Sequence, residues 1–274
     1  MNRTGIALAA LALTLTLHAA RARADGDYLS PTDERFRATI GLLRAGSSTT
    51  LQVDGSNGTP GTFIDGENDL GLDRKRYLPR FEVMVRAGSR HRIWVDYFGL
   101  DRSVTTTLTS SALAFHDSVL QKGFPVTTDL SLRAFGLNYG YSFVKTQRFE
   151  VAGTFAVDAV DISARVRQVS AAGRVDSSEN LAGPFPTPGI AATWVLSRRF
   201  YLDGRAQYLK VAIDHIDGSM AFYEFNALYR LRPNVSFALG YDAVKANLAS
   251  TKVNQAGEFS FSTRGPQILV RVAF

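Results

Sequence analysis

The sequence predicts an all-β protein: a closed antiparallel transmembrane β-barrel of about ten strands, with eight or twelve strands as alternatives. Three observations support this fold class. The N-terminus carries an export signal, later segments alternate apolar and polar residues with a period of two, and the links between those segments alternate between short and long. Successive side chains of a strand point to opposite faces, so the alternation describes a sheet with one apolar and one polar face. Alternating short turns and long loops are typical of outer-membrane barrels.

The first 24 residues form the predicted signal peptide. Arg3 precedes an apolar and threonine run from Gly5 to Leu17, and Ala22-Arg23-Ala24 fits the small-residue rule for cleavage. The run is shorter than the ~20 apolar residues that a membrane-spanning helix needs, which argues against an N-terminal anchor. We therefore expect residues 1–24 to be cleaved, residues 25–34 to form a periplasmic N-terminal segment and residues 35–274 to form the barrel.

Composition excludes several classes of protein. The chain has no cysteine, which excludes disulfide bonds, thiolate metal sites and a cysteine nucleophile. The net charge of +6 includes three arginines of the signal peptide, so the mature chain has 28 basic and 25 acidic residues, or +3. These basic residues are scattered at strand spacing and do not form a phosphate-binding patch, so we expect no nucleic-acid partner. The residue patterns also predict no cofactor.

The turns divide the chain into ten expected strands. Short links are expected at 88–90, 145–147, 197–199 and 232–234, and longer links at 54–76, 109–125, 170–184, 217–218 and 250–257. The expected strands are 35–53, 76–88, 91–108, 126–144, 148–168, 186–197, 200–216, 219–232, 235–249 and 258–274. A turn at residues 44–47 would give twelve strands, and the prolines near 184–188 weaken one strand.

The alternation does not by itself say which face points inward, because a soluble barrel places its apolar face inside. The export signal, the terminal Phe274 on the apolar face and the small residues on the polar face favour an apolar exterior. Aromatic residues beside the expected periplasmic turns would form an interfacial girdle. They are Tyr141, Phe143, Phe149, Trp194, Phe200, Tyr229 and Phe274.

The inward face would then carry thirteen charged residues, seven arginines and six carboxylates. They are Arg37, Arg80, Glu82, Arg86, Arg92, Asp96, Asp158, Asp203, Arg205, Glu224, Arg230, Asp242 and Arg271. An unpaired ion in a low-dielectric interior costs several kcal/mol, so a nearly balanced set indicates salt bridges between opposite walls. Two functions stay open: a structural salt-bridge network, or a narrow solute or ion pore that selects by charge.

Two short motifs raise the possibility of an enzyme at the extracellular rim. His116-Asp117-Ser118 resembles the His-x-Ser pair of lipid A deacylases, which implies an activated serine. Asp214-His215 with Asp217 resembles the acid and histidine pairing of outer-membrane proteases, although Asp217-Gly218 is also explained by a two-residue turn. The rest of the chain departs from the deacylase pattern and has no identified second aspartate pair, so we predict no catalytic residue.

The long loops leave two further possibilities open. The first loop carries oxygen ligands of the kind that calcium prefers, but their spacing does not match a calcium-binding loop, and we predict no metal site. These residues are Asp65, Glu67, Asn68, Asp69 and Asp73. Adhesion or a receptor role of the loops remains an alternative function.

The end of the chain resembles the C-terminal assembly signal of bacterial outer-membrane barrels. Its apolar residues are Ile268, Val270, Val272 and Phe274. Residues 61–65, 69–73, 90–97 and 217–219 resemble a family of uncharacterised proteobacterial outer-membrane β-barrels. This resemblance implies an outer-membrane location and, as partners, membrane lipid and lipopolysaccharide, the barrel assembly machinery and periplasmic chaperones. It implies no chemistry.

Overall fold

The computed structural model describes residues 29–55, 57–109, 112–115, 117–171, 173–213, 216–251 and 256–274. The strands are β1 (Phe36–Val53), β2 (Ile64–Asp65), β3 (Lys75–Ala87), β4 (His91–Thr107), β5 (Leu113–Phe115), β6 (Ser118–Leu120), β7 (Pro125–Lys145), β8 (Phe149–Ser170), β9 (Gly173–Val195), β10 (Phe200–Ile213), β11 (Ile216–Arg232), β12 (Val235–Ser250) and β13 (Gly257–Ala273). None of these residues belongs to a helix long and apolar enough to cross a membrane. The predicted signal peptide lies outside the described residues.

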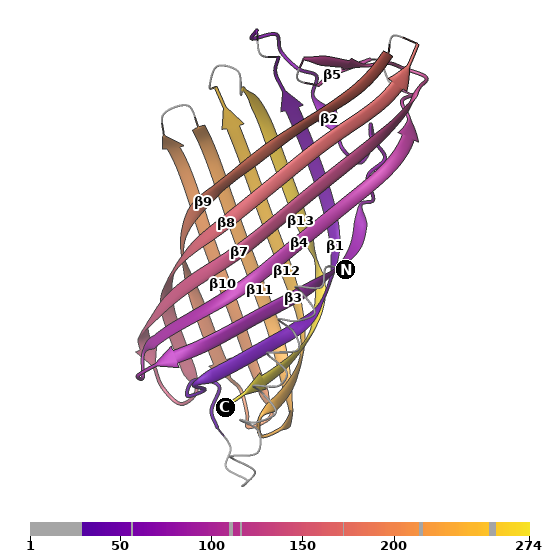
Figure 1. Cartoon of the computed structure of the whole chain (residues 1–274). Coiled ribbons are helices and arrows are strands. Elements are labelled where there is room, and N and C mark those ends of the chain that lie inside the picture. The colour runs from indigo at the N-terminus through magenta and orange to yellow at the C-terminus, as the bar shows by residue number, and fades with distance from the viewer. Residues whose placement is uncertain are drawn as a thin grey trace.

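Ten strands form a closed antiparallel ring, as predicted (Figure 1). Following the ring, the described strands run β1, β3, β4, β7, β8, β9, β10, β11, β12 and β13, and β13 pairs with β1 from Ala273↔Arg37 to Gly257↔Val53. The short strand β2 pairs with β1, and β5 and β6 form a separate hairpin. Short turns join the strands at one end of the ring, the short-turn end, and the longer links lie at the other, the long-loop end.

Three sequence expectations about strand limits are settled by the observed pairing. The stretch at residues 44–47 continues β1 without a turn, which excludes twelve strands. Asp217 and Gly218 are not a turn but lie within β11, paired with Ala212 and Val211 of β10. The expected loop at 170–184 is also wrong, because β9 begins at Gly173 and pairs with β8 from Ser170↔Gly173 onward.

Three prolines near the start of the expected strand 186–197, which were expected to weaken it, lie within β9. A proline cannot donate a hydrogen bond to a neighbouring strand and is therefore confined to strand edges. β9 pairs with β10 only from Val195 to Gly189, so Pro184, Pro186 and Pro188 face an edge that lacks a ladder partner among the described strands. From Gly189 towards the start of β9, strands β9 and β10 diverge (Figure 1).

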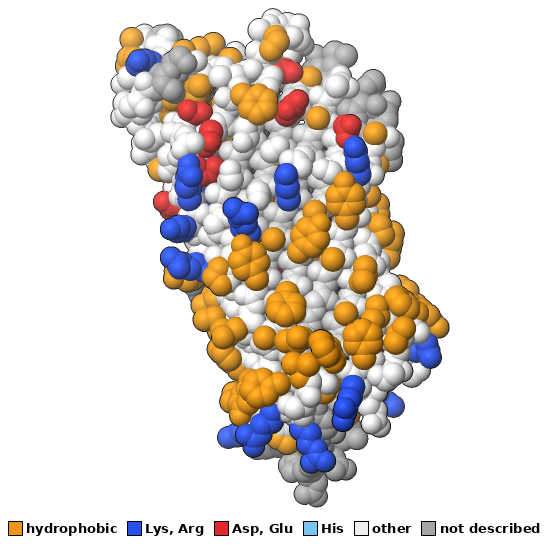
Figure 2. Space-filling model, turned by 180° about the vertical axis from the view of Figure 1, so that it is seen from behind, with side chains coloured by type: hydrophobic (Ala, Val, Ile, Leu, Met, Phe, Trp, Pro, Cys, Tyr) orange, Lys and Arg blue, Asp and Glu red, His pale blue; other side chains and the backbone are white. Residues whose placement is uncertain are grey.

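Near the short-turn end the barrel is apolar outside and polar inside. On β7 the exposed residues Phe135, Leu137 and Tyr139 alternate with buried Asn138 and Gly136. Figure 2 shows hydrophobic side chains gathered over this half of the exterior, with Lys and Arg beyond the apolar band at both ends. An aliphatic and aromatic band of this kind is what a barrel needs to cross a membrane, because no water is present there to solvate polar side chains.

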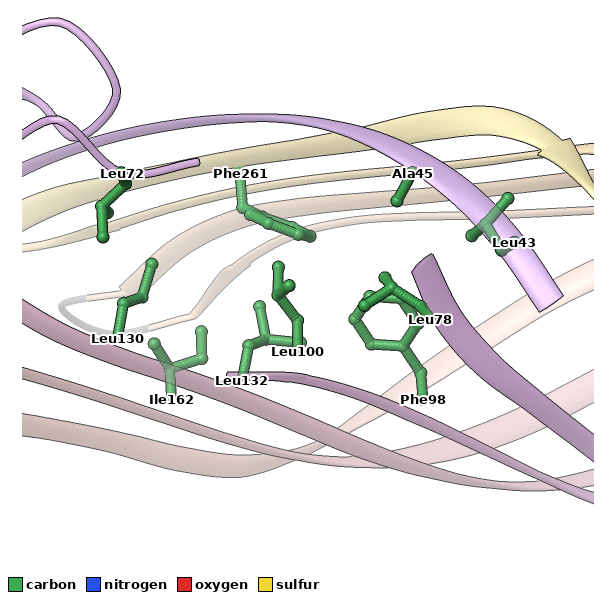
Figure 3. Packing of buried hydrophobic residues seen from close by; sticks show 10 residues of the cluster. All are labelled: Leu43, Ala45, Leu72, Leu78, Phe98, Leu100, Leu130, Leu132, Ile162 and Phe261. Carbon is green, nitrogen blue, oxygen red and sulfur yellow. The ribbon is translucent and has the colours of Figure 1, made fainter. Parts of the chain in front are cut away.

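Towards the long-loop end the outward face becomes polar and the inward face becomes apolar, a change that the sequence pattern did not lead us to predict. On β7 the outward residues become Asp129 and Arg133, and the inward residues become Leu130 and Leu132. Buried apolar residues from β1, β3, β4, β7, β8, β13 and the link before β3 pack together in the lumen there (Figure 3). They are Leu43, Ala45, Leu72, Leu78, Phe98, Leu100, Leu130, Leu132, Ile162 and Phe261. This half therefore has the side-chain arrangement of a water-soluble β-protein.

Candidate functional site

The charged side chains of the lumen gather between the apolar cluster and the short-turn end. Burial and ion pairing place all thirteen residues of the predicted set on the inward face of the ring. Strand alternation decides this locally, because every second side chain of each strand must point inward. We call these residues the lumen network.

Arg205 on β10 is the centre of the lumen network. Its guanidinium lies 3.2 Å from Asp96 on β4, 3.5 Å from Glu224 on β11 and 3.8 Å from Glu82 on β3. β3 stands five strands from β10 in either direction around the ring, so the Arg205–Glu82 contact spans the full width of the lumen. The same guanidinium lies over the rings of Phe222 and Trp94, with 4.6 and 5.5 Å to the ring centroids. One buried guanidinium on β10 thus contacts carboxylates of three other strands, β3, β4 and β11.

Two further ion pairs bridge strands that are not neighbours. Arg271 on β13 binds Asp203 on β10, and Arg80 on β3 lies 3.0 Å from Asp242 on β12. Arg37 lies 2.9 Å from Glu82, on the adjacent strand. Pairing of this kind offsets the cost of removing ions from water.

A third bridge closes the lumen closer to the short-turn end. Arg86 on β3 donates two hydrogen bonds to the carboxylate of Glu150 on β8, at 2.7 and 2.9 Å, and Ser142 donates a further bond to the same carboxylate. Arg92 lies 3.6 Å from Glu150. The predicted set did not include Glu150. Its inward place in the alternation of β8 was the available signal.

Asp158 is the member of the predicted set without an ion pair in the described part of the chain. Its carboxylate accepts a 2.7 Å hydrogen bond from Thr187 on β9. Together with Asp96, Arg80 and Arg205 it lines a cavity of about 70 Å³ whose other lining residues are mainly apolar.

The N-terminal segment covers the mouth of the barrel at the short-turn end. Arg230 donates a 2.6 Å hydrogen bond to the carbonyl of Leu29 and lies 3.9 Å from Glu34, and Arg86 donates a 3.0 Å bond to the carbonyl of Glu34. Lys145 lies 3.0 Å from Asp33. Thr32 and Glu34 are buried. The sequence placed residues 25–34 in the periplasm without predicting this contact, which depends on where the closed ring brings Arg86 and Arg230.

Burial raises the pKa of Glu34 above its ordinary value of 4.5, and this effect exceeds the opposing influence of Arg37, Arg271 and Arg230. One oxygen of this carboxylate, Oε2, has no hydrogen-bond partner among the described residues. The segment is therefore docked by its backbone carbonyls more than by its acidic side chain.

The acidic first loop has a structural use. Glu67 accepts a 2.8 Å hydrogen bond from the backbone of Thr49 on β1 and another from Arg102 on β4, which links β1 to β4 where β3 no longer pairs with β4. Asp65 accepts bonds from the backbone of Glu67 and Asn68, at 3.0 and 2.8 Å. No group of three or more potential metal ligands occurs in the described ranges.

The candidate catalytic motifs are described only in part. His116, Asp214 and His215 lie outside the described residues. Ser118 begins β6 in the hairpin at the long-loop end. His91 lies at the start of β4, where its ring Nδ1 is 2.7 Å from the hydroxyl of exposed Tyr139.

The apolar residues of the expected assembly signal lie along the outward face of the last strand. Ile268 and Val270 are exposed, and the backbone of Phe274 closes the ring by accepting hydrogen bonds from Arg35 and Phe36, at 2.7 and 3.0 Å.

No protein-family model and no curated protein matches the chain. Among solved structures, the outer membrane protease OmpT from Escherichia coli is similar over 92% of this chain and 99% of its own, with 12% identity and a TM-score of 0.57. Two other solved structures are less similar. The toluene transporter TbuX from Ralstonia pickettii has 10% identity and a TM-score of 0.39 over 88% of this chain and 90% of its own. Neisserial surface protein A has 14% identity and a TM-score of 0.30 over 87% of this chain and 97% of its own.

At 12% identity the OmpT comparison shows the fold alone, that of an outer-membrane protein. Together with the closed ring and its outward apolar band, it places the chain in the bacterial outer membrane. The short-turn end is then periplasmic and the long-loop end extracellular.

Proposed function

We propose that this protein is a sealed structural barrel of the outer membrane, in which the lumen network serves as a cross-brace and not as a permeation path. The observation that carries this proposal is the position of Arg205, whose contacts reach Asp96, Glu224 and, directly opposite, Glu82. Charge-selective pores keep an open path between rings of charge. Here the ions of opposite walls are in contact.

Two further features support a sealed lumen. Residues 29–35 lie across the periplasmic mouth, held by Arg86 and Arg230. On the extracellular side the apolar cluster that includes Leu100, Leu130 and Phe261 packs within the lumen. A permeating ion would have to displace both layers as well as the network between them.

Single-channel conductance in a planar lipid bilayer tests this proposal. The mature chain, residues 25–274, should insert in its folded, heat-modifiable form and give no discrete current steps. Arg205→Ala, Phe261→Ala and deletion of residues 29–34 together weaken all three layers and should give steps. Arg133→Ala is the matched control, because Arg133 is exposed on the outer surface. Sign-selective steps from the unaltered chain, changed by Arg80→Ala or Arg230→Ala, would establish the pore instead.

The second candidate function is an activity at the extracellular rim, which the fold shared with an outer-membrane protease favours. Cells that express the barrel would be assayed for cleavage of fluorogenic peptides and for trimming of lipid A. His215→Ala should abolish the first activity and Ser118→Ala the second. If the parent chain shows neither activity, the loops are left with adhesion or a receptor role, which binding of labelled cells to host-cell monolayers would test.

Lipid contact follows from the outward apolar band, and we extend it to lipopolysaccharide. Arg44, Lys245 and Arg264 are exposed on β1, β12 and β13, where the outward side chains change from apolar to polar. Lipopolysaccharide phosphates would bind there through charge-assisted hydrogen bonds. We further propose that the barrel assembly machinery and periplasmic chaperones recognise the outward face of the last strand. Phe274→Ser should slow insertion into the membrane without changing the stability of barrel that has already folded.

A further inference from the structure

The periplasmic half of the lipid-facing surface contains a groove over β8 to β12. Its floor consists of small side chains and its rims of large ones, and its volume is about 500 Å³. The floor is Ala192, Gly204 and Ala206, and the rims are Trp194, Tyr223 and Phe225.

The register of β9, β10 and β11 makes this surface concave. Gly204 on β10 stands between Ala192 on β9 and Phe225 on β11, and Ala206 stands between Ile190 and Tyr223. Strands lie ~4.8 Å apart, so Ala192 and Gly204 leave a channel about two strands wide beside Phe225, which narrows at Ala206 between Ile190 and Tyr223. This channel follows the strands.

The length of the groove matches one leaflet of the membrane. It extends along β10 from Leu202 to Ala206, which is ~13 Å at ~3.4 Å per residue. The apolar band of an outer-membrane barrel is ~25 Å tall, so the groove covers about half of it. Its lower end, at Phe149 and Trp194, directly adjoins the periplasmic turns, so the leaflet that it faces is the periplasmic one.

Three arginines surround this lower end. Arg148 lies in the turn before β8, and its carbonyl accepts a 2.7 Å hydrogen bond from Val195 at the end of β9. Arg198 and Arg199 form the turn between β9 and β10, and both are exposed. Arg199 donates a 3.1 Å hydrogen bond to the hydroxyl of Tyr229, which holds this guanidinium on the outer, lipid-facing side of the barrel. Arg148 and Arg198 have no ion-pair partner in the part of the chain that the structure describes.

We propose that the groove and these three arginines form a binding site for an anionic phospholipid of the periplasmic leaflet. One acyl chain lies in the groove against Ala192 and Gly204, and the headgroup phosphate binds Arg198 and Arg199. Arginine guanidinium groups bind phosphate through paired, charge-assisted hydrogen bonds. Basic clusters beside a membrane-spanning segment attract anionic lipid at about 1 kcal/mol per residue. The proposal depends on the outer-membrane location and is independent of whether the lumen conducts.

Native mass spectrometry of the mature barrel in detergent tests the site with phosphatidylglycerol as the probe and phosphatidylcholine as the neutral comparison. The unaltered barrel should retain one phosphatidylglycerol in preference to phosphatidylcholine. Arg198→Gln with Arg199→Gln should weaken retention about 30-fold, since two arginines contribute about 2 kcal/mol and 1.4 kcal/mol is a factor of ten. Ala192→Phe should also abolish retention by filling the groove, with both arginines intact.

Matched variants on the opposite side of the barrel control for general effects. Arg90→Gln changes an exposed periplasmic arginine between β3 and β4, and Ala87→Phe enlarges an exposed residue of β3. Both should retain phosphatidylglycerol within about twofold of the parent, because neither touches the groove. Equal retention by all four variants would overturn the proposal. So would equal binding of both phospholipids, or preferential retention of lipopolysaccharide at the groove. Each variant is first checked for folding by its heat-modifiable migration.

Discussion

The buried carboxylate of Glu150, which pairs with Arg86 and Arg92 of the lumen network, provides the sharpest test of its ion pairs. Replacing Glu150 with glutamine removes the negative charge that Arg86 binds at 2.7 and 2.9 Å and that Arg92 faces at 3.6 Å. The side chains of Arg86 and Glu150 are only 2% and 1% exposed, so water cannot replace the lost partner. Breaking a buried ion pair by removing one member costs about 3 to 5 kcal/mol. We expect Glu150→Gln to lower the free energy of unfolding by this amount.

Asp176→Asn is the matched control for burial. Asp176 accepts two hydrogen bonds from Arg165, both of 2.7 Å, so this pair has the same paired geometry but lies on the solvent-exposed exterior of β8 and β9. Solvent screening makes exposed pairs contribute little. Its loss should therefore change the free energy of unfolding by a small fraction of the effect at Glu150.

Urea unfolding in phospholipid vesicles, followed by fluorescence of Trp94 in the lumen and Trp194 on the lipid side, measures both variants. Equal destabilisation by Glu150→Gln and Asp176→Asn would contradict the prediction, because it would show that burial does not determine the strength of these ion pairs. So would a cost below about 1 kcal/mol for Glu150→Gln, which is the level of an exposed pair.

Three further outcomes follow from the structure. Phe261→Ala should destabilise the barrel by about 3 to 5 kcal/mol in urea unfolding, since Phe261 is buried in the apolar cluster; a cost below about 1 kcal/mol would contradict that packing. Burial raises the pKa of Glu34, so the folded barrel holds a proton that the unfolded chain releases, and stability should fall as pH rises from 4.5 through the raised pKa. Glu34→Gln should remove this slope, and an unchanged slope between about pH 5 and about pH 8 would contradict it. The hydroxyl of Ser103 and then Arg167 lower the pKa of Asp129, so the carboxylate of Asp129 stabilises the fold fully above pH 3.8 and loses this effect as the pH falls further. Hydrogen exchange at the outer ends of β4 and β7 should therefore accelerate below pH 3.8 in the parent chain and not in Asp129→Asn.

The fold could be predicted from local patterns because the apolar and polar alternation of each strand and the turn residues that end it occur within short stretches of sequence. The tight turns, the two faces of β13 and the number of strands in the ring depend on neighbouring residues, and the structure confirms the predicted ring of ten. The stretch from Gly173 to Pro184 was wrongly expected to be a loop. Pro184, Pro186 and Pro188 indicated locally a weak strand that begins at residue 186, and the longer strand is possible because β9 pairs with β10 only from Gly189 onward.

Alternation also assigned charged residues to one face, but it could not say which of them would meet. The contact of Arg205 with Glu82 joins residues far apart in sequence, and it exists because closure of the ring places β10 opposite β3. The same closure brings Arg86 and Arg230 to the N-terminal segment. Most strand positions and the alternation of two faces were predictable from the sequence, since these follow from the geometry of each strand. Two features depend on the tertiary structure: which charged side chains form ion pairs, and where along the strands the inward face changes from polar to apolar. The first depends on which strands the closed, tilted ring places opposite one another, and the second on where the membrane ends.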